Sequence, residues 1–413
     1  MSQLLKTEQD MRENQPSSAT HSLRVLHIGK YFPPYPGGME TYLRDLMVAQ
    51  TKQGLESTAL VHQSALSLRS STEQYPAGEQ TLSVTRAAVW LRLLFAPISP
   101  SFPWLLNRLI KEKRPDLLHL HMPNLSVFWA LLMPSARRIP WVVQWQSDVL
   151  ASEHRLGLRL FYALYKPFES AVLRRSTKII ASSPPYLKSS ATLAAFRDKC
   201  VVIPLGIRPN TRVQESCSMA ESVDGQPLRI LAIGRLTYYK GFQYLVSAMA
   251  KVPEARLDLV GSGEEQPRLE KLMSELDLTD RVQIHNGVSD EQLEHFIAKA
   301  DCLCLPSVER TEAFGIVLLE AMSHAKPTVI SRVAGSGMAW VVEDGVTGLQ
   351  VPAADACALA ISLTTLQHNR DKLQQLGHNG RLRFNRHFHI EKSAAGVTHL
   401  YQQVRWRQTQ NRQ

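Results

Sequence analysis

The sequence of 413 residues has no long uninterrupted apolar run. A helix needs about 18 such residues to cross a bilayer, so no membrane-spanning helix is expected. The first 22 residues are polar and lack the basic-then-apolar order of a secretory signal, which predicts a disordered tail over residues 1–22. With 44% hydrophobic residues, the remaining chain has enough apolar side chains for two or three buried cores.

Cysteine is scarce and scattered. None of the five cysteines is paired with histidine at the spacing of zinc ligands. Cys302 and Cys304 alternate along one short apolar run, as small buried residues do. This pattern predicts no metal site, no disulfide framework and a reducing, cytoplasmic location.

A dinucleotide-binding motif is also absent. The first apolar run is followed by GKYFPPYPGGMETYLRDL, in which prolines interrupt any G-x-G-x-x-G pattern, so a dinucleotide cofactor is not expected. Gly37 and Gly38 in this segment would still let backbone N–H groups approach a ligand closely. An ordinary tight turn is the alternative interpretation of these two glycines.

Positive charge is concentrated in the first half of the chain. Residues 1–210 contain 25 Lys and Arg against 14 Asp and Glu, whereas the remainder contains 22 against 23. A basic half suits nucleic acid or an anionic membrane surface. Because no recognisable nucleic-acid module accompanies the charge, we expect the membrane and not nucleic acid as the partner.

Short apolar runs alternate with helical patterns through both halves. The runs fall at residues 23–28, 116–121, 140–145, 177–183 and 200–206, and again at 228–234, 255–261, 281–287, 301–305, 326–331 and 347–352. This alternation predicts an α/β protein with two Rossmann-like, doubly wound parallel-sheet domains facing across a cleft. The predicted parts are an N-terminal domain (23–208), a polar linker (209–227), a C-terminal domain (228–388) and a C-terminal helix (389–413).

The segment PSVERTEAFGIVLLE places Glu312 and Glu320 eight positions apart. Its apolar residues predict a helix with Glu312 at the mouth and Glu320 about two turns inside, so that both carboxylates share a face. A carboxylate accepts two hydroxyl hydrogens at once, which suits a sugar. A solvated helix face is the alternative interpretation of the spacing alone.

The segment and its flanking strands resemble the E-x7-E signature of retaining glycosyltransferases with the GT-B fold, in the group-4 (GT4) family. That family includes bacterial lipopolysaccharide mannosyl- and rhamnosyltransferases, and the resemblance covers roughly residues 23–405. It implies a nucleotide-sugar donor, front-face attack by an acceptor hydroxyl, and a C-terminal helix that crosses back onto the N-terminal domain. It also implies that Glu320 binds the ribose, and that Glu312 binds the sugar beside the main chain of Ala313, Phe314 and Gly315.

Two cations follow the first apolar run of the second half, in IGRLTYYKGFQYLV. Arg235 and Lys240 lie five positions apart in a predicted strand-to-helix turn, which is a suitable cradle for a diphosphate. In the resembled family these positions hold the donor diphosphate and stabilise the departing nucleotide. Because no D-x-D motif is present, we expect this clamp to take the role of a divalent metal.

Turn-rich segments follow the next two apolar runs. They contain Gly261, Gly263 and Asn286, which are candidate contacts to the nucleotide base. A purely structural role for these three residues is the alternative.

Two segments of the first half, HLHMPN and QWQSDVL, should line the acceptor side of the cleft. His121 and Asn124 are candidate acceptor contacts. Asp148 and Gln146 are candidate catalytic residues; Asp148 could contact sugar or acceptor, with a helix cap as the alternative. Relatives usually carry a histidine, which contacts the donor sugar near the reacting carbon, where Gln146 stands. Because Gln146 cannot take a positive charge, an altered donor or an inactive protein stays open.

The stretch from residue 86 to 114 is apolar and aromatic, with basic flanks and several prolines. Short amphipathic pieces of this kind suit an interfacial membrane contact, whereas a core helix with a basic face explains the same composition.

The sequence therefore predicts a retaining, metal-independent hexosyltransferase that is peripheral on the inner face of the cytoplasmic membrane. The expected donor is GDP-mannose or a GDP-linked relative, and the expected acceptor is a lipid-linked glycan of bacterial surface polysaccharide synthesis. A UDP-hexose-dependent enzyme and a catalytically inactive GT-B scaffold are the alternatives. A sugar-nucleotide epimerase or a phosphorylase would need acid–base groups or a lysine-bound pyridoxal phosphate that the sequence does not identify.

Overall fold

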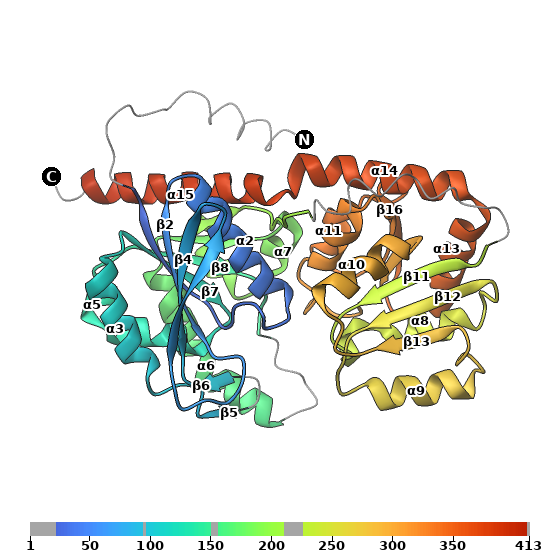
Figure 1. The fold of residues 1–413 in the computed structure, drawn as a ribbon, viewed down its shortest axis with the longest axis horizontal. Coiled ribbons are helices and arrows are strands. Elements are labelled where there is room, and N and C mark those ends of the chain that lie inside the picture. Colours follow the sequence, from blue (N-terminus) through green and yellow to red (C-terminus); the bar gives the residue numbers. More distant parts are fainter. Residues whose placement is uncertain (1–21, 94–95, 150–155, 210–225, 411–413) are drawn as a thin grey trace.

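The computed structural model describes residues 22–93, 96–149, 156–209 and 226–410. Two separate β-sheets organise this part of the chain, and each is covered by helices on both faces (Figure 1). The predicted tail and nearly all of the predicted linker lie outside the described residues, so the proposed domain boundaries stay predictions.

The N-terminal sheet has eight strands, of which seven run parallel. Their order is β10 (Cys200–Val202), β9 (Lys178–Ala181), β8 (Trp141–Trp145), β7 (Leu117–Met122), β1 (Arg24–Ile28), β2 (Glu56–His62), β4 (Gln80–Ala87) and β3 (Ser71–Ala77). The edge strand β3 is antiparallel to β4. The central strands are buried along their whole length, as strands covered on both faces must be.

The C-terminal sheet has six strands, and all of its pairings are parallel. Their order is β13 (Val282–His285), β12 (Ala255–Val260), β11 (Leu228–Ile233), β14 (Cys302–Leu305), β15 (Thr328–Arg332) and β16 (Gly348–Pro352). Cys302 and Cys304 are fully buried free thiols on β14, as predicted.

Helices connect successive strands in both halves. In the first half they are α2 (Gly38–Lys52), α3 (Phe102–Lys113), α4 (Trp129–Leu132), α5 (Pro134–Arg137), α6 (Leu156–Arg175) and α7 (Pro184–Ser189). A small hairpin of β5 (Leu91–Leu93) and β6 (Ala96–Ile98) precedes α3. In the second half they are α8 (Phe242–Met249), α9 (Gln266–Glu275), α10 (Asp290–Lys299), α11 (Ile316–Ser323), α12 (Met338–Val341), α13 (Ala356–His368) and α14 (Arg370–His387). Local sequence fixes several of these starts; for example, Ser289 and Gln292 form a reciprocal capping box at α10.

The last helix, α15 (Ile390–Gln410), crosses from the C-terminal half and lies along α2 of the N-terminal half (Figure 1). Tyr42 and Ser393 share a hydrogen bond of 3.1 Å across this contact, and the Tyr401 hydroxyl lies 2.5 Å from Nδ1 of His119. The two-domain GT-B architecture and the returning C-terminal helix are therefore confirmed. None of the described helices is apolar enough over a sufficient length to cross a bilayer.

The predicted geometry of the glutamate segment is wrong. Helix α11 begins only at Ile316, so Glu312 lies outside the helix in the preceding loop and Glu320 lies in its second turn. The apolar pattern is helical only after Gly315, which adopts φ +79 at the N-cap. The two carboxylates therefore do not share a helix face, and the loop has to place Glu312 separately.

Candidate active site

The two halves meet where the N-terminal ends of α2 and α11 face each other. A Cβ placed on Gly38, at the start of α2, would lie 2.9 Å from Cδ1 of Ile316, at the start of α11. Gly38 thus allows a close approach between the halves. Both helix ends lie at the carboxyl edges of their sheets, where ligands bind in folds of this type.

The centre of the C-terminal side is an ion pair between Lys240 and Glu312. Lys240 Nζ lies 2.5 Å from Glu312 Oε2, and each side chain is only 12% exposed. Burial alone would lower the pKa of Lys240, but the Glu312 carboxylate outweighs it and the pKa is raised. Lys240 therefore carries its full positive charge at neutral pH.

Two backbone features hold this pair in place. Gly241 adopts φ +68, and a Cβ there would come within 2.1 Å of the Pro306 carbonyl oxygen. Only glycine lets the loop after β11 pack this closely on the loop after β14. The second feature is a hydrogen bond of 2.5 Å that the Ser336 hydroxyl donates to the backbone carbonyl oxygen of Glu312.

Arg235 extends the positive charge toward the N-terminal half. Its guanidinium is exposed and close enough to influence the pKa values of Lys240, Lys30 and Glu40. Burial first, and then Arg235 and Arg92, lower the pKa of Lys30, although Glu40 acts in the opposite direction. The cleft thus brings cations of both halves together, which is a suitable field for a diphosphate.

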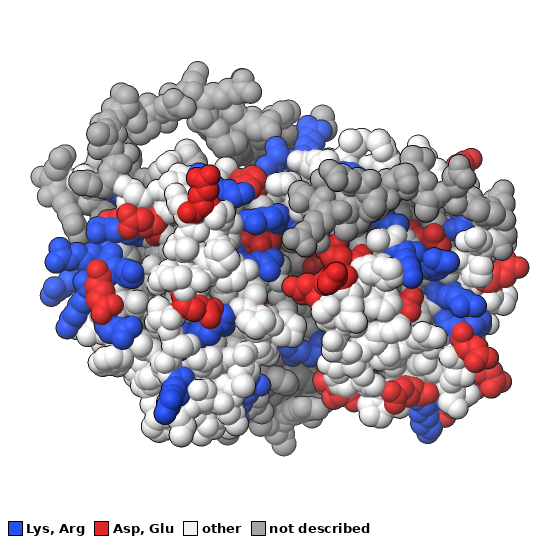
Figure 2. All heavy atoms as spheres, viewed as in Figure 1, with Lys and Arg blue, Asp and Glu red and all other residues white. Residues whose placement is uncertain are grey.

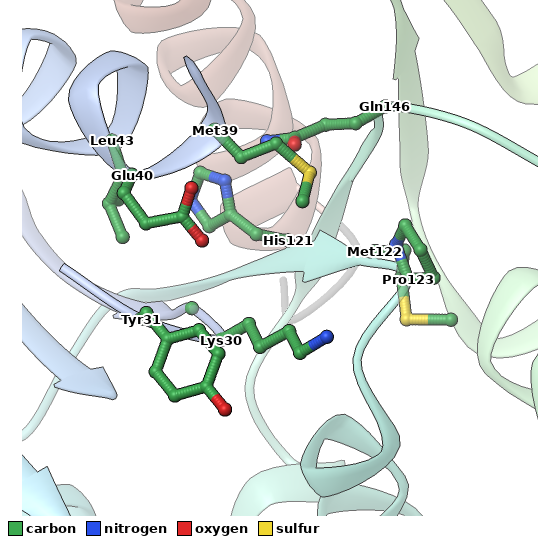
Figure 3. Close-up of a pocket in the computed structure, with 10 residues that line it drawn as sticks. Lys30, Tyr31, Met39, Glu40, Leu43, His121, Met122, Pro123 and Gln146 are labelled. Atoms are coloured by element: carbon green, nitrogen blue, oxygen red, sulfur yellow. The ribbon is translucent and has the colours of Figure 1, made fainter. Parts of the chain in front are cut away.

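A small cavity opens at the carboxyl edge of the N-terminal sheet (Figure 3). Glu40 and Met39 reach it from α2, Lys30 follows β1, His121 comes from β7, and Gln146 follows β8. Burial raises the pKa of Glu40, and the Oε1 atom of Gln146 is buried without a hydrogen-bond partner. An unpartnered buried acceptor is costly, so this cavity is prepared for a polar ligand or water.

Glu320 lies apart from the Lys240–Glu312 pair, among other acidic groups. Burial, and secondarily the Glu294 carboxylate, raise its pKa to about 7. Nearby His324 lowers this pKa, and Asp45 of the N-terminal half contributes to raising it. A carboxyl group with this perturbation is typical of a functional site.

Asp148 is engaged by protein groups on every side. Its Oδ1 accepts from Trp145 Nε1 at 2.8 Å and from Ser190 Oγ at 2.7 Å. Its Oδ2 accepts from Arg310 Nη2 of the C-terminal half at 2.6 Å. Arg310 also lies over the Tyr186 ring, 4.6 Å from its centroid. In this arrangement Asp148 joins the two halves, and its predicted contact to sugar or acceptor stays a prediction.

The other predicted residues fall into two groups. At the cleft, the backbone N–H groups of Phe314 and Gly315 have no hydrogen-bond partner among the described residues. The Phe314 side chain points away into the core, where it packs against Trp340 and Phe388. Ala313 is also buried, and Gly37 precedes α2.

Away from the cavity, several predicted contacts have structural partners. Asn124 accepts a hydrogen bond from the Ser126 backbone as a helix cap. Gly261 and Gly263 pack against the backbone of Gly234 and Leu236. Asn286 is exposed beyond the edge strand β13.

Lys30, Glu40 and Arg310 were not predicted from the sequence. A signal existed for Lys30, because it lies two residues after the first strand, at the carboxyl edge of the sheet. Glu40 is in the first turn of α2, where acidic residues also occur only to stabilise the helix, so it carried no separate signal. The role of Arg310 could not be predicted, because it depends on contacts with the N-terminal half.

Among the described residues, metal-ligand spacing is found in one group, formed by His27, His119 and His121. His27 and His119 are fully buried, whereas His121 also lines the cavity, and none of the three belongs to the Lys240–Glu312 pair.

Two family models match the chain, one in each half. Residues 37–206 match the glycosyl transferase 4-like domain, and residues 217–383 match glycosyl transferases group 1. The chain belongs to this GT4 family of glycosyltransferases and has its GT-B fold. It is accordingly a glycosyltransferase that takes its sugar from a nucleotide-sugar donor, in a family of retaining enzymes.

Curated relatives align over almost the whole chain. The O-antigen chain mannosyltransferase C of Escherichia coli is 27% identical over 387 residues, which cover 92% of this chain and 98% of the relative. The D-rhamnosyltransferase WbpZ of Pseudomonas aeruginosa is 28% identical over 371 residues, with 89% and 92% covered. Among solved structures, sucrose-phosphate synthase from Thermosynechococcus elongatus superposes with a TM-score of 0.74 at 24% identity, covering 92% and 99%.

Proposed function

We propose that the protein transfers mannose or rhamnose from a GDP-linked donor to a lipid-linked glycan, with retention of configuration. The family membership supports sugar transfer, and the two relatives just described are a mannosyltransferase and a rhamnosyltransferase. The setting is surface polysaccharide synthesis on the cytoplasmic face of a bacterial membrane. This setting follows from the O-antigen relative.

The observation that carries the proposal is the buried Lys240–Glu312 pair with Arg235 beside it. In a cleft with little water, fixed cations stabilise the charge that develops on a departing diphosphate. Lys240 and Arg235 supply that charge, so the donor requires no divalent ion at this position. Glu312 positions Lys240 and still has Oε1 available for a sugar hydroxyl.

The rest of the donor extends along the C-terminal half. Glu320 accepts from the ribose hydroxyls, and the free N–H groups of Phe314 and Gly315 donate to the sugar or its phosphate. The acceptor hydroxyl attacks the anomeric carbon from the face that the diphosphate leaves. As the bond from that carbon to the phosphate oxygen breaks, the hydroxyl proton passes to the leaving phosphate.

The acceptor approaches through the N-terminal cavity. His121, Gln146 and Glu40 offer polar groups there, and Lys30 lies between them and Arg235. Gln146 donates and accepts hydrogen bonds to the sugar without becoming charged.

A lipid-linked acceptor requires the enzyme to reach a membrane. Large apolar side chains are exposed around the β5–β6 hairpin and the start of α3: Leu66, Leu68, Trp90, Leu91, Leu93 and Trp104. Lys and Arg gather over α3 and α5, at the left edge of the N-terminal half, and include Lys111 and Lys113 in the last turn of α3 (Figure 2). Apolar side chains flanked by positive charge favour binding to the surface of an anionic bilayer.

The direct test is transfer from candidate donors to a lipid-linked acceptor. The purified protein is incubated in EDTA with GDP-mannose, GDP-rhamnose or a UDP-hexose, together with undecaprenyl-linked glycans, and the lipid products are analysed by mass spectrometry. The proposal predicts a product that is one hexose or deoxyhexose heavier with a GDP-linked donor. A product formed only from a UDP-hexose would replace the donor assignment.

A catalytically inactive scaffold is the second candidate, and Gln146 favours it. Gln146 stands where relatives usually carry histidine, and it cannot stabilise charge near the reacting carbon as an imidazolium would. The scaffold predicts neither transfer nor slow donor hydrolysis, even after Gln146→His. Hydrolysis of a donor by the wild-type protein would reject it.

A further inference from the structure

Three histidines meet inside the N-terminal half, under the floor of the cavity. His27 of β1 is paired in register with His119 of β7, and His121 follows two positions later on the same face of β7. All three side chains are buried, and one ring nitrogen of each lies within 4.8 Å of one from each of the others. The group was invisible in the sequence because 94 positions separate His27 from His121.

The hydrogen bonding of this cluster is incomplete. His27 Nδ1 lies 3.3 Å from His121 Nε2, yet Nε2 of His27, Nε2 of His119 and Nδ1 of His121 are buried without partners. The Gln50 amide is close enough to hydrogen-bond both His27 and Tyr401, whereas the Gln144 amide on the neighbouring strand β8 lacks a partner. Nδ1 of His27 and Nε2 of His121, which face each other, and the unpartnered Nε2 of His119 are the three nitrogens that one ion could share. Leaving a buried nitrogen such as Nε2 of His119 without a partner costs free energy.

The spacing and the chemistry both fit a metal ion. With metal–nitrogen bonds of about 2.0–2.1 Å, two nitrogens at a tetrahedral angle lie about 3.3–3.4 Å apart. Nδ1 of His27 and Nε2 of His121 have this separation, at 3.3 Å, and a ring nitrogen of His119 lies within 4.8 Å of nitrogens of both other rings. Imidazole nitrogens suit zinc, copper, nickel and iron ions.

Tyr401 supplies the outer support that metal-bound histidines usually have. Its hydroxyl lies 2.5 Å from Nδ1 of His119, which orients the ring and leaves Nε2 of His119 free to bind an ion. The Gln50 amide lies near both His27 and Tyr401. His121 also lines the cavity at the carboxyl edge of the sheet, so the cluster borders that cavity.

We propose that His27, His119 and His121 bind one divalent transition-metal ion, such as Zn²⁺. The ion ties β1 to β7, connects both through Tyr401 to α15, and fixes the His121 ring in the cavity wall. It is separate from the donor clamp of Lys240 and Glu312, and the inference does not depend on the proposed donor. It departs from the expectation from the sequence that the protein has no metal site, which stays a prediction.

The test is the metal content of the untagged full-length protein. The protein is dialysed against Zn²⁺, freed of excess ion by gel filtration and measured by inductively coupled plasma mass spectrometry. The expected result is about one zinc per chain in the wild type, and less than about 0.2 in His27→Gln and His119→Gln. His62→Gln is the matched control, because His62 is a buried histidine whose two nitrogens are already bonded to Lys30 and Ser126. The control should keep about one zinc per chain.

Two further measurements keep the test decisive if a histidine variant does not fold. Replacing zinc with Co²⁺ should give the visible absorption of a tetrahedral site. Tyr401→Phe should weaken zinc binding about 10- to 100-fold in competition with a chromophoric chelator. A folded wild type that retains no zinc and shows no Co²⁺ absorption would overturn the proposal. Equal metal content in the wild type and the folded His27 and His119 variants would overturn it as well.

Discussion

Arg310 of the C-terminal half and Asp148 of the N-terminal half form an ion pair across the cleft, with 2.6 Å between Nη2 and Oδ2. The contact is shielded, since the Arg310 side chain is 17% exposed and that of Asp148 is 6% exposed. Arg310 also donates to Ser189 Oγ at 2.9 Å. Because Arg310 is two residues from Glu312, closure of the cleft and placement of the donor clamp depend on the same loop.

Arg310→Gln should therefore open the cleft. Without its partner Asp148 keeps a buried charge, and separation of the two halves lets water solvate it. We expect a larger radius of gyration by small-angle X-ray scattering and a fall in kcat/KM of about 10- to 100-fold, because closure positions the reacting groups.

Arg383→Gln is the matched control for this prediction, since Arg383 pairs with Glu343 within the C-terminal half at 2.6 Å. The exchange Asp148→Arg with Arg310→Asp should recover part of the lost activity. If Arg310→Gln had the same radius of gyration and the same kcat/KM as the control, the ion pair would have no role in closure.

Glu312→Gln and Arg235→Ala should remove turnover while leaving the fold intact. Each change weakens the stabilisation of the leaving diphosphate, and the loss in kcat should be about 10²- to 10³-fold. Arg268→Ala serves as control, because Arg268 forms only a surface pair with Glu265. Full activity in both site variants would show that the donor clamp is assigned to the wrong residues.

Glu320 should make nucleotide binding depend on pH. Its pKa is raised to about 7, so the free protein holds a proton there below that pH. A ribose hydroxyl donates best to the ionised carboxylate, so binding releases this proton. Nucleotide affinity measured by calorimetry should rise with pH, by up to about tenfold per unit below pH 7, and then level off.

Glu320→Gln supplies the control, because it should bind nucleotide with almost no dependence on pH in this range. The same carboxyl should also affect folding. Since its pKa is higher in the folded chain than in the unfolded chain, its contribution to stability falls as pH rises from about 4.5 to about 7. A wild-type affinity that does not change with pH would contradict the assignment of Glu320 to the ribose.

The exposed apolar residues at the hairpin and α3 should bind anionic vesicles. Trp104→Ser combined with Leu91→Ser removes two of them from the predicted contact, and we expect about 10-fold weaker sedimentation with vesicles containing phosphatidylglycerol. Ile361→Ser is a matched control, because Ile361 is an exposed apolar residue on α13 of the other half. Equal vesicle binding by the double variant and the control would place the membrane contact elsewhere.

Much of the fold could be predicted from the sequence, because buried parallel strands appear as short apolar runs between helical patterns. All eleven predicted runs overlap a strand of the two sheets. The missed strands β2, β3 and β4 lie between residues 56 and 87. Strand β3 is largely exposed, and the buried strands β2 and β4 contain polar residues that interrupt their apolar pattern.

The site was harder to predict, because its geometry depends on contacts between distant segments. The helix start at Ile316 is set by the backbone of Gly315, which a periodic pattern does not reveal. The ion pair of Asp148 requires the other half of the protein. Similarly, the histidine cluster requires the register between β1 and β7.

If a nucleotide-sugar donor binds a metal-free clamp of Arg235, Lys240 and Glu312, nucleotides should stabilise the folded protein without a metal ion. The first measurement is thermal unfolding with GDP, UDP, ADP and their sugar conjugates in the presence of EDTA. A ligand that binds only the folded protein raises its stability, by about 2.7 kcal/mol at a concentration 100-fold above Kd. The account predicts a clear increase in Tm with GDP and GDP-mannose that is lost in Arg235→Ala. No increase with any nucleotide would contradict it.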